Sequence, residues 1–437
     1  MQPDDLLDLD VTDVAHGGVF VARHENRVVF VPDAIPGERV RVRLTDTGKS
    51  SFWRAETVEV LDASPHRRPH VWAAADIDIA PELRPGGADF GHIALDHQRA
   101  LKRQVLEDAL RRFGGIADPV VTMRGLPGES PDGTGWRTRV SLHVDEAGRI
   151  GPFAARSHRV ITVDDLPLAT REVAEVAAGL DGFEPGRIDL VQPADGSVRV
   201  ILRPEVPRVP RPPRGKGRRG ARPAPRPPRP REDPTAHEIV TEVASGRTFR
   251  VDAGGFWQVH RLAASALTSL VRDAFTEDDR IDPEAQHLDL YGGVGLFAAT
   301  LADLAGASAQ VTSVESDPRA TEHAGENLAE WVGARAETGR VDGWLGAYAG
   351  SAGARERGRL RRGVVLLDPP RAGAGREVVE QIAGLSPASV VYVACDPVAL
   401  ARDIATFAAH GYRPDRIDGL DLFPNSHHLE TVAVLSR

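Results

Sequence analysis

The sequence predicts an α/β protein with three parts: a small N-terminal β-barrel, a central α+β domain and a C-terminal doubly wound domain. Three observations carry this prediction. Five short strand-like segments fill residues 1–62, a basic, proline-rich tract interrupts the middle of the chain, and strands alternate with helices from residue 251 onward. Such alternation is typical of open sheets with mostly parallel strands. A chain of 437 residues is also long enough for two or three domains.

The N-terminal part, residues 1–62, has the pattern of a small closed barrel. Turn-forming residues at Gly17-Gly18, Glu25-Asn26 and Pro36-Gly37 separate its strand-like segments. We expect strands at Asp8–Val14, Gly18–Arg23, Arg27–Val31, Arg39–Thr45 and Arg54–Leu61. Five short strands in this length favour a barrel of the oligonucleotide-binding (OB) type, and the pattern alone also fits other small barrels.

The central part, residues 63–250, is predicted to be an α+β domain. A helix is expected over residues 95–115, with Asp96 as its cap and Gly114-Gly115 at its end. Its predicted exposed face carries Lys102, Arg103, Arg111 and Arg112, which are either solvated or turned toward RNA. Strands are expected at Arg137–Val144 and Ser197–Leu202.

A basic insertion, residues 203–234, interrupts this central domain. From Arg203 to Arg231 it holds eleven Lys and Arg residues and one acid, Glu205. It has almost no large apolar side chains, so it cannot bury a core. Because it separates Val198–Leu202 from Glu238–Val243, we interpret it as a long insertion at a hairpin tip. It is either a linker or a basic arm that contacts phosphates.

The C-terminal part, residues 251–437, is predicted to be a Rossmann-like, doubly wound domain. Strands are expected at His287–Tyr291, Val311–Glu315, Gly363–Asp368, Val390–Ala394 and Glu430–Leu435. Helices are expected at Leu296–Leu304, Pro318–Trp331, Arg376–Gly384 and Pro397–His410. Sheets of this kind bind ligands at the carboxyl ends of their strands.

A glycine turn follows the first of these strands. The segment Tyr291-Gly292-Gly293-Val294-Gly295 leads into the next helix, whose free N–H groups lie open to a ligand. Glu315, at the end of the next strand, can accept both hydroxyls of a ribose. The third glycine of the dinucleotide pattern is missing, which favours a single nucleoside such as S-adenosylmethionine over NAD. The alternative is a plain strand–helix turn.

Three further residues at strand ends are candidates for chemistry: Asp368, Cys395 and Glu430. Asp368 begins the rigid turn Asp368-Pro369-Pro370-Arg371. Cys395 is the only cysteine in the chain, which excludes an internal disulfide. It is either an inert buried thiol or a nucleophile. His427 and His428 have no ligand cluster beside them in the sequence, so no metal site is predicted.

These motifs resemble the uracil-5 methyltransferases of tRNA and ribosomal RNA, and the similarity covers nearly the whole chain. Its most specific parts are Asp-Pro-Pro-Arg-x-Gly at 368–373, the Cys395 segment, and the segment 423–430. The N-terminal barrel resembles the RNA-binding TRAM domain of many members. The resemblance implies that Cys395 is the nucleophile and Glu430 the base. It also implies an S-adenosylmethionine site lined by Gln258, Tyr291, Leu296, Glu315, Asp342 and Asp368.

The implied reaction is methylation of carbon 5 of a specific uridine in rRNA or tRNA. Addition of the Cys395 thiolate to carbon 6 makes carbon 5 nucleophilic, and Glu430 then removes the carbon 5 proton. The target base must leave its stack to reach the site. Two alternatives stay open. One is a methyltransferase that acts on an exocyclic amino group, and the other is an RNA-binding or assembly factor that kept the fold and lost catalysis.

The chain departs from the family pattern in three places. Ala394 and Asp396 replace the Ser and Asn that commonly flank the nucleophile, and we expect the acid to raise the pKa of Cys395. Leu296 stands where many members have a polar residue. Residues 80–92 resemble an iron–sulfur segment that has lost its cysteines, with Ala88 and Leu166 near two ligand positions. We therefore expect no iron–sulfur cluster.

The N-terminus and the charge bear on where the protein works. The first residues are acidic and form no apolar signal-peptide core, and no apolar run reaches the length that spans a bilayer. We therefore expect a cytoplasmic monomer that binds RNA and no membrane. The net charge of −9 argues against a wholly basic nucleic-acid binder.

Overall fold

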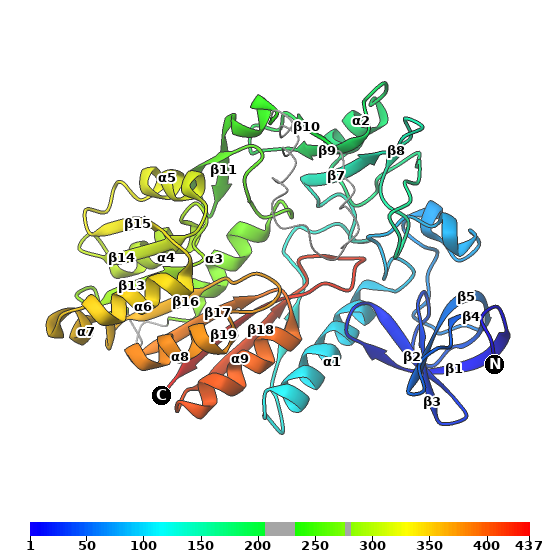
Figure 1. Cartoon of the computed structure of the whole chain (residues 1–437), viewed down its shortest axis with the longest axis horizontal. Helices are drawn as coiled ribbons and strands as arrows, with labels where there is room; N and C mark the ends of the chain where they lie inside the picture. The colour runs from blue at the N-terminus through cyan, green and yellow to red at the C-terminus, as the bar shows by residue number, and fades with distance from the viewer. Residues whose placement is uncertain (206–231, 276–280) are drawn as a thin grey trace, which may run out of the picture.

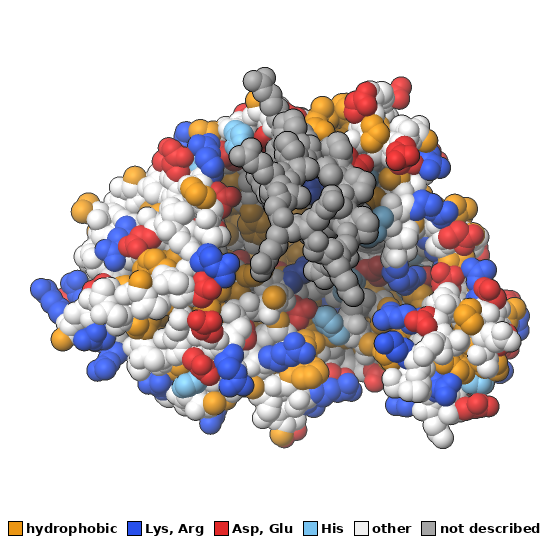
Figure 2. All heavy atoms as spheres, in the orientation of Figure 1, with side chains coloured by type: hydrophobic (Ala, Val, Ile, Leu, Met, Phe, Trp, Pro, Cys, Tyr) orange, Lys and Arg blue, Asp and Glu red, His pale blue; other side chains and the backbone are white. Residues whose placement is uncertain are grey.

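A computed structural model describes residues 1–205, 232–275 and 281–437 of the chain (Figure 1). Most of the predicted insertion 203–234, and its proposed contact with phosphates, therefore lies outside the described residues. The described strands form a closed barrel, a four-stranded sheet, a two-stranded sheet and an eight-stranded sheet. On the face shown in Figure 2, acidic and basic side chains are intermixed over all parts of the molecule.

The N-terminal barrel closes in the order β1-β2-β3-β5-β4. Its strands are β1 (Leu6–Ala15), β2 (Val19–His24), β3 (Arg27–Val31), β4 (Arg39–Asp46) and β5 (Phe52–Asp62). Buried and exposed side chains alternate along these strands, and Phe20, Val29 and Val40 are fully buried inside. Period-2 alternation is the pattern that places one face of a strand inside a barrel. The predicted five-stranded barrel is confirmed.

The central part contains a four-stranded sheet in the order β10-β9-β7-β8. Its elements are β7 (Arg139–Val144), β8 (Ile150–Gly151), α2 (Arg171–Ala178), β9 (Gly186–Val191) and β10 (Arg199–Pro204). The segment β11 (Ile239–Ala244) pairs with β12 (Arg247–Asp252) in a sheet of their own. The hairpin predicted across the insertion is therefore wrong. Each strand pairs instead with its neighbour across a short turn, since short connections favour pairing of sequential strands.

The eight-stranded sheet has the order β15-β14-β13-β16-β17-β19-β18-β6. Its strands are β13 (Gln286–Leu290), β14 (Gln310–Glu315), β15 (Ala334–Thr338), β16 (Val364–Leu367), β17 (Ser389–Ala394), β18 (Arg413–Leu420), β19 (Glu430–Ser436) and the distant edge strand β6 (Thr122–Arg124). The strands from β15 to β17 are parallel, whereas β19 is antiparallel to both of its neighbours. The prediction of a doubly wound domain is confirmed, and β6, β15 and β18 were not predicted.

Helices cover both faces of this sheet, so its central strands are apolar on both sides. Val364 and Leu366 of β16 pack with α3 and α4, whereas Val365 and Leu367 pack with α6, α8 and α9. The helices are α3 (Ala263–Asp273), α4 (Leu296–Ala305), α5 (Pro318–Asn327), α6 (Val341–Ser351), α7 (Ala354–Leu360), α8 (Gly375–Leu385) and α9 (Pro397–Ala409), and short 3-10 turns lie at Ala73–Ala75, Pro81–Leu83 and Pro234–His237. Among the described residues, no helix combines the length and apolar character needed to cross a bilayer.

The helix α1 (Leu95–Phe113) lies between the barrel and α9 (Figure 1). Two sequence predictions fail here. The N-cap is Ala94 rather than Asp96, and the Lys102 side chain is buried rather than exposed. Lys102 Nζ lies 2.5 Å from Asp421 Oδ1 and donates to the Phe423 carbonyl (3.0 Å). Loss of one partner from such a buried pair costs about 3–5 kcal/mol, so α1 fixes the segment that leads to Glu430.

Candidate active site

A cavity of about 1270 Å³ opens at the carboxyl ends of the parallel strands, facing the segment after β12. Seven of the eight predicted site residues line it: Gln258, Tyr291, Glu315, Asp342, Asp368, Cys395 and Glu430. Leu296 is the exception, because its side chain is buried in the core at the start of α4. The cavity therefore brings together residues that are up to 172 positions apart in the chain, from Gln258 to Glu430. The role of each remains a prediction.

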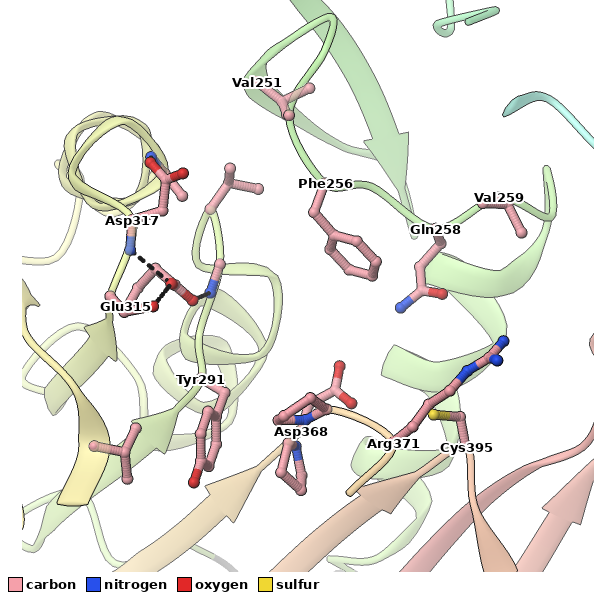
Figure 3. Close-up of a pocket in the computed structure, with 18 of the residues that line it drawn as sticks. Val251, Phe256, Gln258, Val259, Tyr291, Glu315, Asp317, Asp368, Arg371 and Cys395 are labelled. Carbon is pink, nitrogen blue, oxygen red and sulfur yellow. Dashed lines mark hydrogen bonds between the residues drawn. The ribbon is translucent and has the colours of Figure 1, made fainter. Parts of the chain in front are cut away.

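The glycine turn after β13 positions one end of the cavity. Tyr291 adopts a left-handed conformation (φ 63°), which costs a non-glycine residue about 1–2 kcal/mol and turns its ring toward the cavity (Figure 3). Gly292 admits no side chain, because a Cβ there would collide with Ser313 Oγ. This close packing lets the turn reach the end of the neighbouring strand β14.

Glu315, at the end of β14, is held by donors on both oxygens. Its Oε2 accepts from the Gly293 N–H (3.1 Å), and its Oε1 accepts from Ser316 Oγ (3.0 Å) and the Asp317 N–H (2.8 Å), as Figure 3 shows. A carboxylate has about four lone-pair sites, so these three bonds leave capacity for a hydroxyl. The position fits the predicted contact with a ribose.

Gln258 and Phe256 face this turn from the segment after β12. The Gln258 amide makes no hydrogen bond to any described residue, and Figure 3 shows it directed into the space above Asp368 and Arg371. The Phe256 ring is 73% exposed although it belongs to the cavity wall. An uncommitted amide beside an exposed ring is suited to a flat, polar ligand, because stacking and hydrogen bonding are both available.

Cys395 and Glu430 lie side by side although 35 residues separate them. Strands β17 and β19 are antiparallel with Ala394 opposite Thr431, so the next position along this register places Cys395 opposite Glu430. Residues opposite each other on adjacent strands have Cβ atoms about 4.5–5.5 Å apart. The sheet itself therefore places the predicted nucleophile and the predicted base within reach of one small substrate.

The electrostatics of this pair follow from burial and from neighbouring charges. Burial is the main cause that raises the pKa of the Cys395 thiol to about 11; the carboxyls of Glu430 and Asp368 contribute in the same direction, and the Arg371 guanidinium opposes them. Burial also raises the pKa of Glu430 well above its usual range, with Asp368 adding to the effect and Arg371 again opposing it. Near neutral pH the Cys395 thiol is therefore mainly protonated, and the charge of Arg371 favours the ionised form of both groups.

Asp396 does not act on Cys395 as the sequence predicted. Its Oδ1 accepts from the N–H groups of Val398 (3.0 Å) and Ala399 (2.8 Å) and so caps α9, while Oδ2 lies 3.0 Å from His16 Nε2 of the barrel. The carboxylate thus points away from the thiol toward the helix and the barrel. The pKa of Cys395 is raised as expected, but its burial and the acids Glu430 and Asp368 are the cause.

Two residues near the nucleophile were not predicted as parts of the site. Arg371 was visible in the sequence, directly after Asp368-Pro369-Pro370, and a cation at a strand end beside an acid was the available signal. His16 gave no signal, because only the folded barrel brings the turn after β1 to Asp396. The barrel also approaches the 423–430 segment closely, since a Cβ at Gly18 would collide with the His427 ring.

The segment that resembles an iron–sulfur site is packed with apolar side chains. Ala88 is buried in one cluster with Trp72 and Trp136, and Leu166 packs against the same cluster. Ala88 and Leu166, which stand near two cluster-ligand positions of the family, therefore lie close together in the fold, and both make apolar contacts there. His427, where no metal site was predicted, bonds through Nδ1 to Asp89 (2.7 Å).

Comparison with known proteins places the chain in a family. The tRNA (uracil-5-)-methyltransferase family matches residues 358–437, and the TRAM domain matches residues 6–56. An RNA methyltransferase of Streptomyces avermitilis is 37% identical over 441 residues, covering 98% of this chain and 97% of the relative. The chain belongs to the RNA uracil-5-methyltransferase family. The predicted family and the predicted TRAM domain are thereby confirmed.

Two further known proteins are similar to the chain, one in sequence and one in fold. An RNA methyltransferase of Bifidobacterium longum is 34% identical and covers 97% of this chain and 95% of its own length. The solved structure of Pyrococcus abyssi tRNA (uracil-54, C5)-methyltransferase in complex with S-adenosyl-L-homocysteine has a TM-score of 0.65 at 20% identity. It covers 98% of this chain and 100% of that chain, so the two share their fold over the whole length.

Proposed function

We propose that this RNA methyltransferase transfers a methyl group from S-adenosylmethionine to carbon 5 of a uridine in transfer or ribosomal RNA, through a covalent adduct with Cys395. The observation that carries the proposal is the position of Cys395 opposite Glu430 on adjacent strands, in the cavity that also holds Glu315 and Gln258. A thiol and a carboxyl in this arrangement match a reaction that adds a nucleophile and later removes a proton from the neighbouring carbon.

The cavity has groups suited to S-adenosylmethionine. Glu315 retains acceptor capacity for the ribose hydroxyls, and the uncommitted Gln258 amide and the carboxylates of Asp342 and Asp368 lie around the same space. Tyr291 supplies a ring at the glycine turn. When bound, the cofactor supplies an electrophilic methyl group that carbon 5 of the adduct takes.

Cys395 performs the first step of the proposed reaction. Its thiolate forms a bond to carbon 6 of the uracil, and the electron pair of the 5,6 double bond moves toward the carbonyl at carbon 4 as an enolate. Carbon 5 thereby becomes nucleophilic. The thiol proton passes to solvent before addition, and Arg371 favours this loss because its charge stabilises the thiolate.

Glu430 performs the last step. After methylation, carbon 5 carries both a methyl group and its original proton. The Glu430 carboxylate takes that proton, the double bond re-forms, and the bond from carbon 6 to sulfur breaks with return of the electron pair to Cys395. Burial beside Asp368 raises the pKa of Glu430, which makes its carboxylate a stronger base than an exposed one.

Two variants test this division of roles. We expect Cys395→Ala to abolish methyl transfer while leaving S-adenosylmethionine binding intact, because the thiol acts on the base. We expect Glu430→Gln to accumulate a protein–RNA adduct that survives denaturation and carries the labelled methyl group. Wild-type protein should release tritium from RNA labelled at carbon 5 of uridine.

Each alternative predicts a different outcome of these experiments. Methyl transfer without tritium release would identify an amino-group methyltransferase, and RNA binding without either signal would identify an assembly factor. Full activity of Cys395→Ala would refute the covalent mechanism.

A further inference from the structure

Two arginines of the cavity have no acidic partner among the described residues. Arg137 precedes β7, Arg371 follows β16, and both side chains line the same cavity as Cys395. Arg137 uses Nε to donate to the Arg139 carbonyl (3.0 Å), which leaves its two terminal amino groups uncommitted within the part of the chain that the structure describes. Asp368 and Glu430 line the same cavity and Glu430 is influenced by the charge of Arg371, but neither arginine forms an ion pair with a described residue, so both keep hydrogen-bond donors available to an anionic ligand.

Arg139, two residues after Arg137, has hydrogen-bond acceptors from the same region of the fold. Its guanidinium pairs with Glu242 (3.0 Å) and donates to the carbonyls of Ala253 (3.1 Å) and Gly255 (2.7 Å). Both arginines are half-buried, yet both terminal amino groups of Arg139 are bonded to acceptors, whereas those of Arg137 face the cavity without one among the described residues. The difference points to a ligand as the missing partner of Arg137.

The backbone fixes the direction in which Arg137 points. Its N–H donates to the Leu168 carbonyl (2.8 Å), and its own carbonyl accepts from the Thr170 N–H (3.0 Å). The pyrrolidine rings of Pro369 and Pro370 stiffen the loop that carries Arg371, and the Gly373 N–H closes this loop onto the Pro370 carbonyl (2.8 Å). Both guanidinium groups are therefore presented from rigid supports, as anion recognition requires.

The charges themselves favour an anion. Burial lowers the pKa of Arg137, and the like charge of Arg371 lowers it further. An anion between the two guanidinium groups would remove their repulsion and supply acceptors for their free N–H groups. Guanidinium groups bind phosphate through paired hydrogen bonds.

We propose that Arg137 and Arg371 together hold one backbone phosphate of the RNA, next to the target uridine. This inference rests on the proposed function. A phosphate is favoured because Arg371 lies beside Cys395, the residue that the proposed reaction joins to the RNA base (Figure 3). Basic and acidic side chains are intermixed on the face in Figure 2, so this face has no continuous basic surface for RNA. Contacts with RNA phosphates on this face would therefore depend on local sites such as the one formed by Arg137 and Arg371.

The test compares Arg137→Gln, Arg371→Gln, the double variant and the control Arg376→Gln. Arg376 lines the same cavity, is largely exposed and pairs with Glu380, so it controls for the loss of a positive charge. The measurement is the dissociation constant of an unmodified RNA transcript in the presence of S-adenosylhomocysteine, over a range of salt concentrations. The dissociation constant of S-adenosylhomocysteine is measured in parallel.

We expect each single variant to weaken RNA binding about tenfold or more, since charge-assisted hydrogen bonds are lost. The salt slope should fall by about 0.7, the value for one phosphate contact on a single strand. If both arginines hold one phosphate, the double variant should lose less affinity than the product of the two single losses. Arg137→Lys should keep part of the affinity, because it keeps the charge and loses the paired geometry.

Three outcomes would overturn the proposal. Unchanged RNA affinity and salt slope in Arg137→Gln would show that no phosphate is bound. Weaker S-adenosylhomocysteine binding would show that the anion is the cofactor's carboxylate, and fully multiplicative losses would show two separate contacts. Adduct formation by Glu430→Gln reports separately on the proposed chemistry, so failure of the two ideas can be told apart.

Discussion

Because Cys395 is the only cysteine of the chain, the ionisation of the proposed nucleophile can be measured at a single atom. Alkylation by iodoacetamide requires the thiolate, and mass spectrometry of the intact protein counts the modified fraction without interference from other thiols. The perturbation is unfolding in denaturant, which removes the burial and the neighbouring carboxyls that raise the thiol pKa. The rate in the native protein is compared with the rate in the unfolded protein at several pH values.

The structure sets the size of the difference. Burial, with Glu430 and Asp368, raises the pKa of Cys395 from 9.0 to about 11. At pH 8 the thiolate fraction is therefore about 100-fold lower in the native protein, and at pH 10 it is about tenfold lower. Access of the reagent to the thiol and the intrinsic nucleophilicity of the thiolate also differ between the native and the unfolded protein. These differences multiply each rate by a factor that does not change with pH. The ratio of unfolded to native rates should thus fall about tenfold between pH 8 and pH 10.

Variants extend this measurement to the causes of the shift. Glu430→Gln and Asp368→Asn remove charges that raise the thiol pKa, so the native thiol should react faster at a given pH. Arg371→Gln removes the opposing charge and should slow the reaction. A ratio of rates that stays constant from pH 8 to pH 10 would refute the reasoning, because it would show that access alone limits the native thiol.

Three further predictions concern regions outside the reacting pair. Elemental analysis of the purified protein should find no stoichiometric iron. The reason is that Ala88 packs with Trp72 and Trp136 at the place where other family members hold an iron–sulfur cluster. One iron–sulfur cluster per chain would contradict this prediction. Deletion of residues 207–231 should weaken RNA binding and lower its salt slope by about 0.7 per lost phosphate contact, without moving the methylated uridine; a moved uridine would mean that the segment selects the site. His16→Ala should speed hydrogen exchange in the first turn of α9 relative to wild type at pH 6 and not at pH 9. The hydrogen bond to Asp396 raises the pKa of His16, so its stabilisation is complete below 6.5 and is lost as pH rises through the raised value; equal effects at both pH values would contradict the pairing.

The sequence predicted those elements whose local pattern of apolar and polar residues matches their burial in the folded protein. The strands β16 and β17 are short apolar runs that end in turns, and they are buried on both faces as such runs predict. Most of the candidate site was predictable for the same reason, because Asp368, Cys395 and Glu430 stand at the ends of such strands. The glycine turn and Glu315 followed from their spacing.

The remaining features depend on contacts between distant segments. The strand β18 begins with Arg413, Pro414 and Asp415, which do not resemble a strand, and it forms because β19 and β6 lie beside it. Lys102 belongs to a helix with several other basic residues, and only the fold brings it to Asp421, which is 319 positions away. Asp396 was expected to raise the pKa of Cys395 because the two residues are adjacent in the sequence. Adjacency does not reveal the direction of a side chain, and the Asp396 carboxylate bonds to α9 and His16 instead.

The edge strand β6 has a consequence for how the protein is made. Thr122 Oγ1 donates to Asp418 Oδ1 (2.6 Å), and these residues are 296 positions apart. At about 5–20 residues per second, the ribosome needs roughly 15–60 s to deliver the partner of β6 after β6 itself. During this time the segment around Thr122 and the outer face of α1 emerge without the surfaces that later cover them. The last step of biogenesis is therefore the closure of the C-terminal sheet onto a segment that emerged long before, and a chain that stops before β18 would leave an unpaired edge for chaperones and proteases to recognise.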